Sequence, residues 1–165
     1  MNRKKRIIAG ILIVLLIAGV WNREQIYLNI SMYRFFKALE NENIDDFTLT
    51  VYGPLDVFTL YPLKVDDLIR ICKDTKIVIK GNDLKEHIDS FKQLSNVNLK
   101  PAKKKSAFMN IRFYYVFESK KYGELFGFAM ASSNFNAYVN GIEVVNAYDV
   151  FWFPVMSFKR ELERK

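Results

Sequence analysis

Residues 108–145, FMNIRFYYVFESKKYGELFGFAMASSNFNAYVNGIEVV, decide the fold class of this chain. Apolar and polar residues alternate along much of this stretch, as in strands with one buried face. Asn140-Gly141 lies between two short runs of this kind, and this dipeptide is the strongest short-range signal for a β-hairpin. The pattern predicts a meander of about four antiparallel strands, expected at Phe108–Glu118, Tyr122–Ala131, Phe135–Val139 and Ile142–Val145. The first strand should place Ile111, Phe113, Tyr115 and Phe117 on one face.

The segments on either side of the meander predict further strands and helices. The strands are expected at Phe47–Tyr52, Val57–Tyr61 and Lys76–Lys80. The helices are expected at Asn22–Asn41, Val65–Cys72, Asp83–Leu94 and Asp149–Glu163, and a lysine-rich loop at Ser95–Ser106. Asp83 and Glu86 have the spacing of a capping box at the start of the third helix. Because strands and helices are partly segregated, we expect an α+β domain in which helices pack on an antiparallel sheet.

The N-terminus carries the pattern of a membrane-targeting segment. Four basic residues, Arg3–Arg6, precede the uncharged run Ile7–Trp21, which as a helix spans roughly 22 Å. We expect residues 1–21 to form a signal anchor, a transmembrane helix with the basic end in the cytoplasm. A cleaved signal peptide is the alternative, because its apolar region is equally short. Residues 22–165 then form one extracytoplasmic domain, tethered in the first case and secreted in the second.

The positive charge gives little reason to expect a nucleic-acid partner. The net charge is +7, but Arg3–Arg6 contribute +4 of it, which leaves +3 for the remaining chain. That value is ordinary for a soluble domain. No nucleic acid is therefore expected among the partners.

The residue types that carry most catalytic and metal chemistry are scarce. His87 is the only histidine and Cys72 the only cysteine, so neither a metal site nor a catalytic dyad has its usual members. We expect His87 to lie at the surface, off the apolar stripe of its helix, and Cys72 to be a small core residue. No catalytic residue, cofactor or metal ligand is predicted.

Two adjacent pairs of acids leave one enzymatic interpretation open. Asp45-Asp46 and Asp66-Asp67 would serve a carboxylate-dependent envelope hydrolase if the two pairs converged in a cleft. Each pair also lies where a turn or a helix cap is expected. We therefore expect structural roles and keep the hydrolase as the alternative.

Two surfaces are candidates for binding. Lys100, Lys103, Lys104 and Lys105 form a basic cluster for an anionic contact, such as lipid head groups. Near the C-terminus, aromatic residues exceed what one buried helical stripe needs, and the candidates for a partner surface are Trp152, Phe153 and Met156.

The chain resembles small, uncharacterised membrane-anchored or exported proteins of Gram-positive bacteria. The resemblance is carried by IDDFTLTVYG (44–53), IVIKGNDLKEHIDSFKQLSN (77–96), IRFYYVFESKKYGELFGFAM (111–130) and YVNGIEVV (138–145). It implies a place in the bacterial cell envelope and carries over no activity or binding residues. Together these features predict a non-catalytic, membrane-tethered binding or accessory module that contacts the membrane and another envelope protein.

Overall fold

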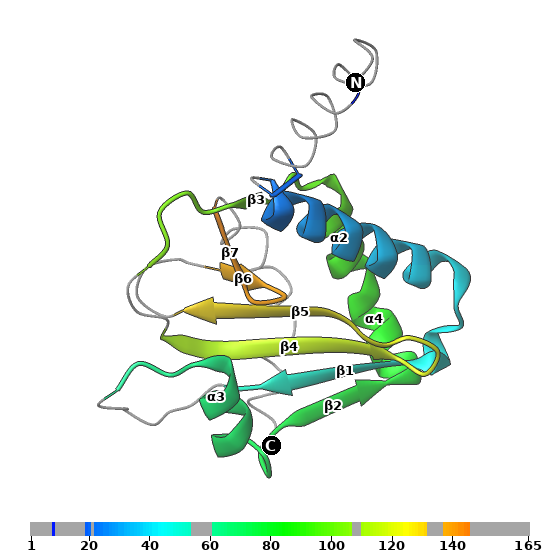
Figure 1. The fold of residues 1–165 in the computed structure, drawn as a ribbon. Coiled ribbons are helices and arrows are strands. Elements are labelled where there is room, and N and C mark those ends of the chain that lie inside the picture. Colours follow the sequence, from blue (N-terminus) through cyan, green and yellow to red (C-terminus); the bar gives the residue numbers. More distant parts are fainter. Residues whose placement is uncertain are drawn as a thin grey trace.

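One antiparallel sheet of seven strands runs through the structure, in the order β2-β1-β4-β5-β6-β7-β3 (Figure 1). The computed structural model describes residues 8, 19–20, 22–53, 61–106, 110–131 and 137–145. The strands are β1 (Phe47–Tyr52), β2 (Ile77–Lys80), β3 (Lys100–Pro101), β4 (Ile111–Ser119), β5 (Gly123–Ala131), β6 (Ala137–Val139) and β7 (Ile142–Val145). The helices are α2 (Arg23–Asn41), α3 (Val65–Ile71) and α4 (Gly81–Lys92), with 3-10 turns η1 (Ile44–Asp46) and η2 (Gln93–Asn96).

The predicted α+β class and the predicted meander are both confirmed. Strands β4, β5, β6 and β7 pair in chain order, and β1 and β2 extend the same sheet beyond β4. Asn140 and Gly141 have φ values of 47° and 80°, the left-handed pair that a tight type I′ hairpin turn requires. The alternation of side chains therefore identifies these strands correctly.

The two faces of the sheet are covered by different helices. The larger core joins α2 and α4 to one face through phenylalanine and leucine side chains, among them Leu28, Phe35 and Phe91. A smaller core on the other face joins α3 to the sheet, and it holds Leu68 and Cys72. In Figure 1, α4 lies behind the sheet, α3 in front of it, and α2 along its upper side next to β5. Cys72 is buried, as the sequence predicts.

A bulge at Arg112 makes one part of the face prediction wrong. Phe113, Tyr115 and Phe117 contribute to the larger core as expected, but Ile111 belongs to the smaller core on the opposite face. The pairing of β4 with β5 shifts between Ile111 and Phe113, which inserts one extra residue into β4. Since each residue of a strand alternates between faces, one extra residue moves Ile111 to the other side.

Two predictions about the third helix are wrong, one about where it starts and one about which residues it buries. α4 starts at Gly81 with Lys80 as its N-cap and has no side-chain cap, so Asp83 and Glu86 do not form a capping box at its start. His87 is buried rather than exposed. Its position three residues after Leu84 and four before Phe91 places it on the same inner stripe of the helix.

The expected loop at Ser95–Ser106 holds more regular structure than predicted, because it contains the end of η2 and the short strand β3. Three other expectations fall outside the described residues: the closing helix at Asp149–Glu163, most of the strand at Val57–Tyr61, and almost all of the apolar run Ile7–Trp21. Tyr61 itself is described and is not part of a strand. Among the helices that the structure does describe, none combines the length and the apolar character needed to cross a bilayer.

Candidate binding groove

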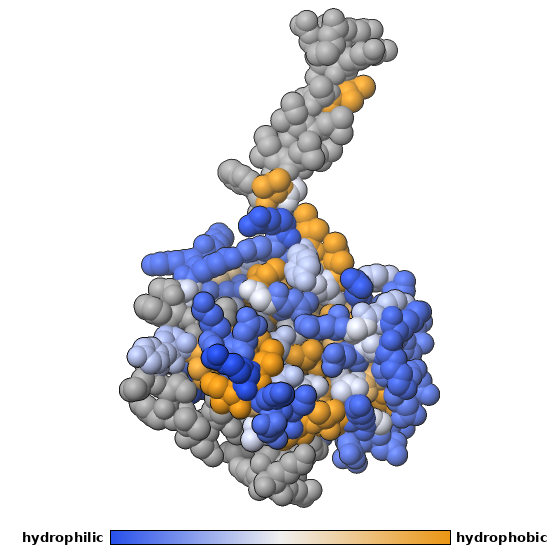
Figure 2. All heavy atoms as spheres, turned by 60° about the horizontal axis from the view of Figure 1, so that its bottom comes forward, coloured by the Kyte–Doolittle hydropathy of each residue, from blue (hydrophilic) through white to orange (hydrophobic). Residues whose placement is uncertain are grey.

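Helix α2 has a second apolar stripe on the side that faces away from the core. Ile30 and Tyr33 are 52% and 63% exposed, and Ile26 and Tyr27 are also exposed. Positions 26, 30 and 33 recur every three to four residues, so they form one stripe along the helix. Figure 2 shows apolar surface among hydrophilic side chains at the end of the domain where α2 begins. A helix with apolar residues on two sides has more apolar surface than is needed to pack on its own core.

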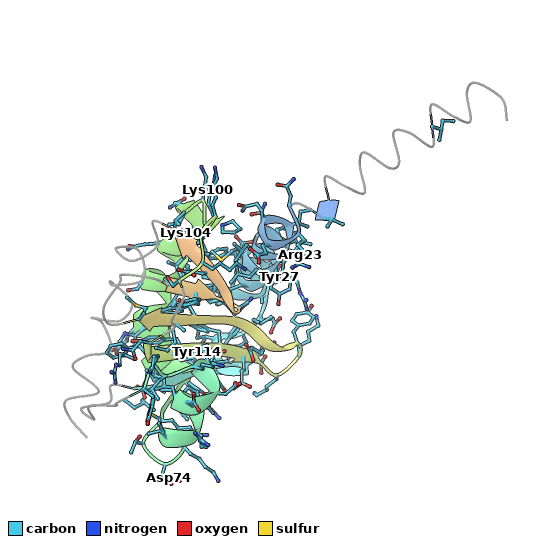
Figure 3. All side chains as sticks on the ribbon, turned by 60° about the vertical axis from the view of Figure 1, so that its left-hand side comes forward. Arg23, Tyr27, Asp74, Lys100, Lys104 and Tyr114 are labelled. Atoms are coloured by element: carbon cyan, nitrogen blue, oxygen red, sulfur yellow. The ribbon has the colours of Figure 1, made fainter. Side chains whose placement is uncertain are left out.

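This outer stripe borders a cavity of about 400 Å³. One wall comes from α2, and the floor comes from β4, β5 and β6, with the Asn140-Gly141 turn at one end. The aromatic, apolar and charged side chains that line the cavity include Tyr27, Ile30, Arg34, Tyr114, Glu124 and Tyr138. Figure 3 labels Tyr27 on α2 and Tyr114 on β4, the helix and one of the strands that form it.

A second cavity of about 410 Å³ continues further along α2. It shares Arg34 and Leu125 with the first, so the two adjoin. Its other lining residues include Tyr33, Lys37, Glu42, Lys121 and Tyr122. We refer to the two adjoining cavities together as the α2 groove.

The groove exists because β5 extends beyond β6. Among the described residues, Phe128–Met130 of β5 pair with β6, and Asn140 ends this ladder at Gly127. The Gly127 N–H donates to the Asn140 Oδ1 at 2.6 Å, and the Asn140 N–H donates to the Gly127 carbonyl at 2.7 Å. Helix α2 lies beside the first half of β5 instead, where Phe35 stacks on Phe126 with ring centroids 4.7 Å apart.

Gly127 also gives the floor of the groove its shape. A Cβ at this position would lie 2.7 Å from the Tyr114 hydroxyl oxygen, so a larger residue would displace that ring. The Tyr114 hydroxyl lies near Glu124 and donates to its carboxylate over 3.4 Å. Burial, together with the charge of Glu124 and this hydrogen bond, raises the pKa of Tyr114 well above its usual range, so it is a neutral donor at physiological pH.

The walls of the second cavity combine cations with tyrosine rings. The Lys37 Nζ lies 5.5 Å from the centroid of the Tyr33 ring, and the Lys121 Nζ lies 4.7 Å from that of Tyr122. Contacts of this kind stabilise the ammonium groups. A hydrogen bond with Tyr122 and its charge raise the pKa of Lys121, with a smaller contribution from the charge of Glu42.

Two polar groups of the groove lack the partners that such groups usually have. Both carboxylate oxygens of Glu42 are buried, and neither has a hydrogen-bond partner among the described residues. Arg34 is exposed and forms no ion pair within the described part of the chain. Buried acceptors without a donor are costly, so a ligand that supplies one would gain affinity.

The acidic pairs do not converge. Asp45 and Asp46 lie in η1 before the first residue of β1, and the Lys120 Nζ donates to the Asp46 Oδ1 at 2.8 Å. Asp66 and Asp67 lie in the first turn of α3, and Figure 1 shows α3 near the opposite end of β1 from η1. Asp67 accepts from the Lys64 N–H at 3.3 Å and pairs with Arg70. These contacts are the turn and capping roles that the sequence indicates.

The other predicted site residues are distributed as follows. Lys100 lies in β3, and Lys103, Lys104 and Lys105 follow it in the exposed segment before Ser106. Trp152, Phe153 and Met156 lie outside the described residues. Within the part of the chain that the structure describes, no three His, Cys, Asp or Glu side chains gather as a metal site requires.

Sequence reasoning did not identify the α2 groove. Its one signal in the sequence is the outer stripe of α2, whereas its floor depends on strands that are distant along the chain. Comparison with family models, with curated proteins and with solved structures finds no match to this chain. The α+β class and the groove are therefore the features from which a function can be argued.

Proposed function

We propose that this protein is a non-catalytic, membrane-tethered binding module of the bacterial cell envelope, and that the α2 groove binds a segment of another envelope protein. The observation that carries the proposal is the groove itself, two adjoining cavities along a helix whose outer stripe is apolar and exposed. Tyrosine and arginine are enriched where protein interfaces gain most of their affinity. This groove offers five tyrosines and one arginine, Tyr27, Tyr33, Tyr114, Tyr122, Tyr138 and Arg34.

The chemistry of the groove favours an extended protein segment as the occupant. The cavities adjoin along one helix, which suits a chain with several side chains in sequence better than a single compact molecule. Arg34 at the junction would pair with a carboxylate of that segment. Apolar side chains of the segment would contact Ile30 and Leu125.

The tether rests on the N-terminal sequence. The apolar run ends at Trp21, and α2 begins two residues later at Arg23, so the helix that forms one wall of the groove would follow the anchor directly. The resemblance to membrane-anchored or exported proteins of Gram-positive bacteria supports the same location. Hydrolysis by paired carboxylates has less support, because the two acidic pairs lie in turns that do not meet.

Site-specific photo-crosslinking in the cells that naturally produce the protein tests this proposal. A photoreactive phenylalanine at Tyr33 of the full chain should form a discrete crosslinked species with another envelope protein. Arg34→Glu should lower its yield at least about tenfold, because it replaces an ion pair by a like-charge contact. The matched charge reversal Lys85→Glu, at an exposed position of α4 outside the groove, should leave the yield unchanged.

Two results would contradict the proposal. One is a crosslinking pattern from Tyr33 that Arg34→Glu does not alter. The other is the absence of any Tyr33-dependent species in cells where the protein reaches the membrane fraction.

A further inference from the structure

The lysine-rich segment that follows β3 is attached to the first turn of α2. Lys105 forms an ion pair with Glu24, and the Gln25 side-chain amide donates to the Leu99 carbonyl at 2.9 Å. Both α2 residues lie directly after Arg23, the first residue of the helix. The lysine segment is therefore held next to the point where the chain leaves its apolar N-terminal run.

A single buried residue of β7 fixes the shape of this segment. The Glu143 carbonyl accepts from the Ala102 N–H at 2.8 Å. Its carboxylate accepts from the Ser106 N–H at 2.8 Å and from the Ser106 hydroxyl at 2.7 Å. Because one glutamate binds both ends, the residues between them form a clamped loop rather than a freely moving tail. The backbone that carries Lys103 and Lys104 is thus attached to β7 on both sides.

This loop and the start of α2 form a surface of nearly pure positive charge. We call it the basic end and define it by Arg23, Lys100, Lys103 and Lys104, all of which are exposed. Glu24 and Lys105 neutralise one another, and residues 97–106 contain no acidic residue. Within the described residues none of the four basic-end side chains forms an ion pair. Figure 3 shows Lys100 and Lys104 at the same end of the domain as Arg23, with Asp74 at the opposite end.

We propose that the basic end docks on anionic lipid head groups of the membrane into which the N-terminal run inserts. This inference rests on the proposed tether, which would place Arg23 at the bilayer surface and the clamped loop beside it. Lysine and arginine side chains near an anionic surface are attracted to its phosphates and lose that attraction beyond a Debye length. Docking fixes the start of α2 against the membrane, and it thereby sets the direction in which the α2 groove points.

Lipid-dependent quenching in nanodiscs tests the docking. The full chain, with Asn98→Cys carrying a fluorophore at an exposed position beside the loop, is reconstituted into nanodiscs that contain brominated lipid. Cys72 is buried and does not compete for the label under native conditions. Quenching should be strong in discs with anionic phosphatidylglycerol, weak in discs of phosphatidylcholine alone, and reversed by high salt.

Two charge-matched double variants identify the surface responsible. Lys103→Ser with Lys104→Ser should shift the ratio of docked to undocked domain roughly thirtyfold toward the undocked form. Lys73→Ser with Lys76→Ser removes the same charge near Asp74, at the far end of the domain, and should leave quenching unchanged.

The outcomes separate failure of the docking from failure of the tether. Equal quenching in anionic and zwitterionic discs would overturn the docking while the tether stands. An equal loss of quenching in both double variants would do the same. A chain that does not enter the discs would overturn the tether, and the docked orientation with it.

Discussion

Phe35→Ala is expected to destabilise the domain by about 3–5 kcal/mol, the usual cost of removing a fully buried phenylalanine side chain. The Phe35 ring is completely buried and contacts the rings of Phe36, Phe117 and Phe126. It packs α2 on the first half of β5, where β4 pairs on one side and the printed pairs with β6 do not reach on the other. Because small domains have about 5–15 kcal/mol of stability in total, a large fraction of the variant should be unfolded near 37 °C.

Urea denaturation of the full chain in mild detergent, followed by tyrosine and tryptophan fluorescence, measures this effect. Tyr33→Ala on the same helix is the control, because Tyr33 is 63% exposed and should change stability by less than about 1 kcal/mol. If Phe35→Ala cost no more than Tyr33→Ala, α2 would not be packed on β5, and the groove between them would not exist.

Gly53→Ala is expected to cost at least about 3 kcal/mol, because strained backbone and a steric clash coincide at this position. Gly53 has a φ of 106°, and a Cβ there would lie 2.3 Å from the backbone carbonyl oxygen of Arg112. That carbonyl belongs to the bulge of β4, which cannot move without disturbing its pairing with β5. The end of β1 and the bulge therefore require a residue without a side chain.

Gly123→Ala provides the matched control for the clash. Gly123 also has a positive φ, 69°, but a Cβ at this position would meet no atom within 4 Å, so only backbone strain of about 1–2 kcal/mol is expected. The same denaturation measurement compares the two variants. Equal losses of stability would mean that Gly53 does not pack against the bulge.

Local patterns in the sequence are sufficient to predict most of the elements. Alternating side chains locate the long strands, and the Asn140-Gly141 pair locates the hairpin, because both signals arise within a few residues of chain. The bulge at Arg112 has no such signal. The residue that makes room for the bulge is Gly53, about sixty residues earlier, and only the folded sheet brings the two together.

The difference between local signals and tertiary contacts also bears on the predictions about the third helix that are wrong. The apolar spacing along the third helix predicts that His87 lies off its buried stripe, whereas the structure buries His87 together with Leu84 and Phe91. The capping signal at Asp83 predicts a later start for α4, whereas the helix continues directly from β2 at Gly81. For His87, packing on the sheet outweighs a local preference.

The groove can be predicted only in part. The outer stripe of α2 is present in the sequence at Ile26, Ile30 and Tyr33, but a stripe alone does not say what lies opposite it. The floor of the groove is open beside β5 because Asn140 ends the pairing of β5 with β6 at Gly127. Strand lengths of this kind are set by tertiary contacts, and they are the least predictable feature of a sequence.

Protease treatment of intact cells, followed by mass spectrometry of the membrane fraction, tests the tethered location most directly. We expect full-length protein with its N-terminal residues intact in the membranes of untreated cells. We also expect external protease to remove peptides of residues 22–165 while leaving the N-terminal segment behind. Mature protein that begins near Val20 and is recovered from the medium, or a domain fully protected from external protease, would contradict the membrane-tethered, outward-facing binding module proposed for this chain.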